Sequence, residues 1–210
     1  MSFGYQVLGF GSSTDRRIVG VIQQGNWETS AQTLTDTKAG DVIFAATGAL
    51  FNNTDTSISG FTSIASNTAT NQWTSNANAY VQGRISYKVL TGSETEIAAL
   101  PSSSGGTYVQ FRFAKKVTSV STQDLATSKG NHSGNYGAVS GTHAAVIRWL
   151  TQGAYGGGGA KTLSTGDPQI AQSGDYGGTL ITESVESGSF SMEGVIFGGE
   201  AYFVTAICND

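Results

Sequence analysis

The stretch that decides the fold is YVQGRISYKV, residues 80–89, in which apolar and polar side chains alternate. A period of two residues is typical of a β-strand that packs one face on a hydrophobic core. We therefore predict a strand with its basic residues on a solvated face. The core face would carry Val81, Ile85, Tyr87 and Val89, and the solvated face Gln82, Arg84, Ser86 and Lys88.

A second alternating run covers residues 107–113, where Val109, Phe111 and Phe113 share one face. We expect this strand to lie beside the first in one sheet. Gly198 and Gly199 separate the last two strand candidates and predict a tight hairpin, because glycine readily adopts positive φ. An edge strand is also expected near residues 161–163. The other candidates are 18–23, 41–47, 61–65, 117–122, 143–151, 189–197 and 200–208.

The composition of the 210 residues agrees with strands: there are 29 Gly, 2 Pro and only 12% charged residues. A helical bundle would need abundant Glu, Lys, Leu and Ala at helical spacing. Hydrophobic content of 38% and a net charge of −4 argue against disorder. We predict an all-β, antiparallel, jelly-roll-like β-sandwich with little helix. Residues 1–32 would form an extended N-terminal arm with the first strands, and 33–210 the sandwich domain.

The distribution of charged and apolar residues bears on which partners the protein binds and where it is located. The 11 basic residues are scattered, whereas nucleic-acid binding needs them clustered, so no nucleic-acid partner is predicted. No apolar run approaches the length of a membrane span, and the N-terminus is a poor signal peptide. The single cysteine, Cys208, is expected to be a buried hydrophobe in the last strand.

No motif for catalysis stands out, and we predict neither an enzyme, nor a cofactor, nor a metal site. No serine has the glycine spacing of a nucleophile elbow. The run 155–162 is similar to a phosphate-binding loop but has Tyr155 and Ala160 where that loop needs glycine. His132, His143 and Cys208 do not have zinc-ligand spacing. An acidic pair for glycoside hydrolysis is defined by its separation in space and stays open at this point.

Aromatic residues in polar, glycine-rich segments are a different signal. Trp73, Tyr136 and Tyr155 are flanked by Asn, Gln, Ser or Gly, as in sites where a ring stacks on a sugar and amides bind its hydroxyls. The same residues equally suit a protein interface, or packing over their own loops. Trp149, inside the apolar run 144–150, is expected in the core.

Three segments together carry a resemblance to a known family. They are the AGDVIFA run at 39–45, the ISGFTSI run at 58–64 and the ISYKVLTGSE run at 85–94. In this succession the chain resembles a jelly-roll-like domain of structural proteins in tailed bacteriophages, although the aromatic residue after glycine, often Trp there, is Phe61 here. The opening residues 1–11 are similar to the N-termini of small phage virion proteins. The resemblance covers residues 1–11 and 39–113.

The resemblance implies a virion component, made in the host cytoplasm, such as a capsid decoration protein or a subunit of a head or tail appendage. Its partners would be other capsid or tail proteins, and it would form a homo-oligomer, most simply a trimer. The N-terminal segment would attach it by adding a strand to a neighbour's sheet. The alternative is a glycan-binding receptor-recognition module of a phage tail fibre. The attachment residues would be Phe3, Tyr5, Val7, Leu8 and Phe10.

Overall fold

A computed structural model describes residues 17–27, 29–50, 57–70, 80–100, 104–129, 131–153, 160–166, 168–172, 178–193 and 200–210. Every regular element in this part of the chain is a β-strand. The strands are β1 (Ile18–Trp27), β2 (Gln32–Thr33), β3 (Val42–Leu50), β4 (Thr62–Thr70), β5 (Tyr80–Val89), β6 (Glu96–Ile97), β7 (Ser104–Phe113), β8 (Ser119–Lys129), β9 (His132–Tyr136), β10 (Ala145–Gly153), β11 (Lys161–Leu163), β12 (Pro168–Gln172), β13 (Thr179–Glu183), β14 (Gly188–Met192) and β15 (Glu200–Asn209).

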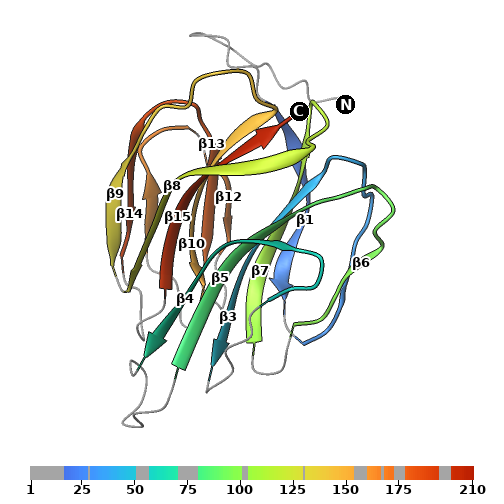
Figure 1. The fold of residues 1–210 in the computed structure, drawn as a ribbon, viewed down its shortest axis with the longest axis horizontal. Helices are drawn as coiled ribbons and strands as arrows, with labels where there is room; N and C mark the ends of the chain where they lie inside the picture. The colour runs from blue at the N-terminus through green and yellow to red at the C-terminus, as the bar shows by residue number, and fades with distance from the viewer. Residues whose placement is uncertain are drawn as a thin grey trace, which may run out of the picture.

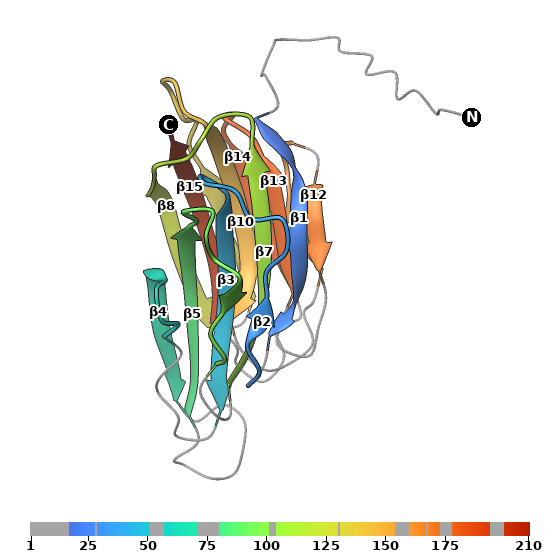
Figure 2. The same ribbon diagram turned by 90° about the vertical axis from the view of Figure 1, so that its right-hand side faces the viewer.

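Two five-stranded antiparallel sheets form the body of the molecule. The first sheet has the order β1-β7-β3-β5-β4, and the second has the order β12-β13-β10-β15-β8. The predicted antiparallel β-sandwich is therefore confirmed. The jelly-roll connectivity is not, because the chain completes the first sheet before it begins the second, whereas a jelly roll alternates between its sheets. Figures 1 and 2 show the two sheets packed against each other.

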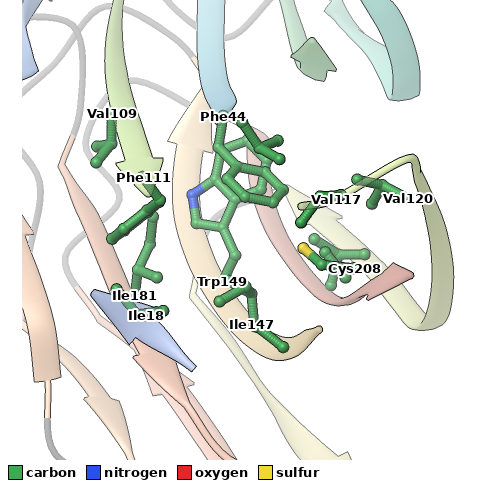
Figure 3. Packing of buried hydrophobic residues seen from close by; sticks show 14 of the residues in the cluster. Ile18, Phe44, Val109, Phe111, Val117, Val120, Ile147, Trp149, Ile181 and Cys208 are labelled. Carbon is green, nitrogen blue, oxygen red and sulfur yellow. The ribbon is translucent and has the colours of Figure 1, made fainter. Parts of the chain in front are cut away.

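The space between these sheets holds the main core, where alternate residues of both sheets interdigitate. Phe44 of β3 lies edge-on to Trp149 of β10, with ring centroids 5.4 Å apart. Trp149 and Cys208 are both buried, as predicted, and Figure 3 shows them in this cluster. Ile85, with Tyr87 and Val89 packed beside it, occupies the core face predicted for β5.

The outer face of the first sheet is also covered, so the solvated face predicted for β5 is wrong. A second cluster buries Ile43 and Tyr108 of the sheet beneath side chains from β6 and the connecting segments. Ser86 is buried, and Lys88 is mostly covered and forms an ion pair with Glu94. Alternation along one strand cannot show that distant segments fold over its polar face. Those covering segments contribute Leu34, Ile58, Leu90, Ile97 and Leu100.

A third sheet, with the order β11-β14-β9, covers the outer face of the second. Phe190 of β14 stacks on Phe203 of β15 with ring centroids 4.2 Å apart and an interplanar angle of 4°. The central strands β10 and β15 of the second sheet are thus buried on both faces. Figure 1 shows the successive layers side by side. The edge strand predicted at 161–163 is present as β11.

Two predicted strand pairings are wrong. The strands on either side of Gly198 and Gly199 do not pair, because β14 belongs to the third sheet whereas β15 pairs with β10 and β8. The strands β5 and β7 share the first sheet but flank β3 instead of touching each other. Within residues 1–32, β1 pairs with β7 and places Ile18 in the main core, so this part of the segment is integral to the sandwich.

Candidate functional site

The predicted ligand and attachment residues fall almost entirely outside the described part of the chain. Trp73, Tyr155 and the attachment residues Phe3, Tyr5, Val7, Leu8 and Phe10 lie outside it.

Tyr136 is described, and the expectation that its ring offers an open face is wrong. Its side chain is 4% exposed and stacks on Phe203, with ring centroids 5.1 Å apart. Its hydroxyl lies 2.6 Å from Thr165 Oγ1. The physical reason is register: alternate residues of β9 face the second sheet, and Tyr136 is one of them.

The Arg148 guanidinium forms a buried polar network at the same place. It comes from β10, is fully buried, and lies 4.5 Å from the Tyr136 ring centroid. Nε donates to Ser184 O at 3.1 Å, and Nη2 donates to Gly137 O and Glu186 O, each at 2.9 Å. Burial lowers the pKa of Arg148, but arginine stays charged in proteins. This one side chain therefore ties the second sheet to the segments that lead into and out of the third.

Asp124 completes the Arg148 network from the edge strand β8. Its Oδ2 lies 3.6 Å from Arg148 Nη1 and accepts hydrogen bonds from Gly137 N at 3.2 Å and Thr205 Oγ1 at 3.3 Å. Asp124 has φ +50° and sits where the β8–β15 register shifts. A bulge of this kind re-aims a side chain, and here it turns the carboxylate toward the guanidinium.

A second arginine, in the first sheet, organises another polar network. Arg112 of β7 makes a bidentate pair with Asp41, through Nε to Oδ1 at 3.0 Å and Nη2 to Oδ2 at 2.8 Å. Its Nη1 donates to Asp36 Oδ2 at 2.8 Å. The buried Gln110 amide donates to Asp41 Oδ2 at 3.1 Å. The hydrogen bond from Arg112 lowers the pKa of Asp36, which is opposite to what the general acid of a glycosidase requires.

Two turns pack against each other beside Asp41, and both belong to the motifs that carry the phage resemblance. Gly40 N donates to Leu90 O at 2.9 Å, and Leu90 N donates to Asp41 O at 2.8 Å. Gly40 has φ +90° and Gly92 has φ +93°. A Cβ on Gly92 would lie 2.7 Å from Ala39 N. Glycine is thus required at both positions by conformation and by close approach.

The Glu94 carboxylate closes the second of these turns. It accepts hydrogen bonds from Thr91 N and Gly92 N, at 3.0 Å and 3.1 Å to Oε2. Partial burial raises the pKa of Glu94, but these hydrogen bonds together bring it below its ordinary value. The AGD and TGSE motifs therefore act in the described structure as elements that fix the fold.

A small surface pocket adjoins the Arg112 network. It has a volume of about 120 Å³ and is lined by Lys38, Gly40, Asp41, Arg112, Lys115 and Lys116, together with Ala39 and Phe113. Lys38 precedes β3, whereas Lys115 and Lys116 lie in the segment that crosses from the first sheet to the second. Folding thus brings Lys38 beside three basic residues, Arg112, Lys115 and Lys116, that lie 74 or more positions later in the sequence. Sequence reasoning did not identify this cluster, because no periodic signal links its parts.

Among the described residues, no group of three or more His, Cys, Asp or Glu side chains could hold a metal ion. No helix in the described ranges is long and apolar enough to cross a membrane.

The fold and these networks define the chain as an antiparallel β-sandwich protein with a third, covering sheet. No protein family, curated protein or solved structure matches it.

Proposed function

We propose that this chain is a non-enzymatic structural component of a tailed-phage virion, attached to its neighbours through its N-terminal end. The observation that carries the proposal is the character of β1. This edge strand follows the N-terminal segment directly, runs for ten residues and contains no charged side chain. Val19 is 65% exposed and Val21 is 37% exposed, which is unusual for an edge open to solvent.

An edge strand has one row of backbone N–H and C=O groups without a partner in its own sheet, so a strand of another chain can pair with it. Proteins that must avoid such pairing place Lys, Pro or bulges on the edge. β1 has register shifts near Val19 and Ile22 but neither Lys nor Pro. A strand from a neighbouring subunit would gain main-chain hydrogen bonds there and cover the two valines.

The layered interior also suits a structural role. The central strands β3, β10 and β15 are buried on both faces, and the motifs of the phage resemblance fix turns instead of lining a catalytic cleft. A virion protein has to keep its shape outside the cell without chaperones, and a well-packed β-stack meets that need. The resemblance at 39–45, 58–64 and 85–94 supplies the assignment to phage particles.

The test is incorporation into phage particles. Deletion of residues 1–11 should leave a folded domain, measured by circular dichroism, that no longer co-sediments with particles. Val21→Lys should likewise reduce incorporation by adding a charge to the β1 edge. Leu125→Lys is the matched control, since Leu125 is 46% exposed on β8, an edge of the other sheet. Full incorporation of both the deletion and the Val21 variant would refute the proposal. Analytical ultracentrifugation of the free protein would test the expected trimer.

A further inference from the structure

The pocket beside Asp41 concentrates positive charge on an acidic protein. Four of the chain's 11 basic residues line it, although the net charge of the whole chain is −4. Three of the four are lysines, at positions 38, 115 and 116. Lys38 and Lys116 are exposed, and Lys115 has a half-exposed side chain. Their ammonium groups are therefore accessible to a ligand from solvent.

The carboxylates around this pocket are already engaged. Asp41 is 2% exposed, and its two oxygens accept hydrogen bonds from Arg112, Gln110 and the Lys38 backbone N–H. Asp36 is bound by the same guanidinium, and Asp210 lies 2.5 Å from Lys115 Nζ. Within the described residues, neither Lys38 nor Lys116 has a carboxylate at ion-pair distance. In this part of the chain the Asp36 charge acts on Lys38 only through space, without an ion-pair contact, so both ammonium groups remain open to a ligand.

The surroundings of these lysines are rigid. A Cβ on Gly40 would lie 2.6 Å from Lys116 Cγ and 2.8 Å from Val117 N, so the Lys116 stem packs directly on the Gly40 turn. The Lys38 backbone N–H is held by Asp41 Oδ2 at 3.0 Å. The Arg112 pair with Asp41 is bidentate and mostly covered, and it anchors this side of the pocket. The backbone at Lys38 and the base of the Lys116 side chain are therefore in place before a ligand binds.

We propose that this pocket binds a tetrahedral oxyanion, a phosphate or sulfate group, between Lys38 and Lys116, with Lys115 as a third contact. Lysine binds phosphate as a point charge, and two exposed ammonium groups supply the charge that such an anion needs. The volume of about 120 Å³ is several times the ~10–15 Å³ that one water molecule requires, so the pocket has room for an oxyanion. A long polyanion is disfavoured, because the basic residues form one cluster on an acidic chain and not a track.

The experiment is isothermal titration of the full chain with inorganic phosphate, against sodium chloride at equal ionic strength. The wild-type protein should bind phosphate saturably. The double variant Lys38→Gln with Lys116→Gln should bind at least about tenfold more weakly, a loss of about 1.4 kcal/mol, because it removes both exposed charges that would contact the anion. Lys88→Gln is the matched control: it removes the same charge from a lysine that does not line the pocket, and its affinity should equal that of the wild type.

A second titration with glycerol 3-phosphate distinguishes the sources of the group. Equal affinity for the ester would assign the pocket to a phosphate carried by a larger molecule, and binding of inorganic phosphate alone would assign it to the free anion. The proposal is overturned if the wild type shows no saturable binding beyond the chloride control, or if the double variant keeps wild-type affinity. Because the readout is phosphate affinity and not particle incorporation, this result is independent of the proposed virion role.

Discussion

Replacement of Arg148 by Met should be among the most destabilising single changes in the described structure. The variant removes the donors to three backbone carbonyls, those of Gly137, Ser184 and Glu186, and to Thr205 Oγ1. A polar group left unsatisfied in the interior costs about 1–3 kcal/mol. Gly137 and Glu186 are exposed residues whose carbonyls can regain water, so they add little, whereas Ser184 O and Thr205 Oγ1 account for about 1.5 kcal/mol each. The sum is a loss of about 3 kcal/mol in the free energy of unfolding.

The assay is urea unfolding followed by intrinsic fluorescence, with a slope of about 2–3 kcal/mol/M for a chain of this size, so the midpoint should fall by about 1 M. Arg84→Met is the matched control, because it removes the same side chain from a partly exposed site on β5, and it should cost about 1 kcal/mol or less. Asp124→Asn should also cost about 1 kcal/mol, since the carboxylate is 25% exposed and Asn tolerates positive φ. A loss below about 1 kcal/mol for Arg148→Met would refute the view that this guanidinium joins the second and third sheets.

Three further predictions test the turns and the core. Gly40→Ala should lower the free energy of unfolding in urea by about 3 kcal/mol or more. Gly60→Ala, at a glycine with φ +78° where a Cβ would have only Lys88 Nζ within 3.6 Å, should lower it by about 1–2 kcal/mol. Equal losses would contradict the view that close approach at Gly40 excludes a side chain. The lowered pKa of Glu94 stabilises the folded state above the ordinary pKa of 4.5, and this stability is lost as the pH falls below that value. The free energy of unfolding of Glu94→Gln should therefore fall less on acidification than that of the wild type. Identical pH profiles of stability would count against this. Burial raises the pKa of the Cys208 thiol, so a thiol reagent at pH 8 should label the native protein only as fast as it unfolds, and rapid labelling would place Cys208 at an accessible position.

The parts of the fold that depend on local pattern were predictable. The alternation in residues 80–89 and 107–113 indicates strands with Ile85 and Phe111 facing inward, and the structure confirms both. Trp149 and Cys208 follow from apolar runs in the same way. The hairpin predicted at Gly198 and Gly199 was wrong, because a glycine pair in a sequence indicates a turn without specifying which sheet the next strand joins.

The polar networks could not be predicted, for a related reason. Arg112 alternates with apolar residues in the run 107–113, and nothing in that pattern shows that folding brings it against Asp36 and Asp41, which lie 71 or more positions away. A lone arginine in the apolar run 144–150 was a visible signal for Arg148, yet its carbonyl partners come from loops with no sequence pattern of their own. The sequence left a sugar-binding site, an interface and internal packing open for Tyr136, because the exposure of its ring depends on the register of β9.

Local pattern is enough to predict that this protein is all-β, because a period of two and the scarcity of charge and proline act locally on each strand. Long-range packing is what buries β10 and β15 on both faces, places Arg148 in the interior and brings Lys38 and Lys116 to one pocket. The reason is that burial and charge pairing depend on contacts between residues far apart in the chain, and a local sequence pattern does not show which distant residues come into contact.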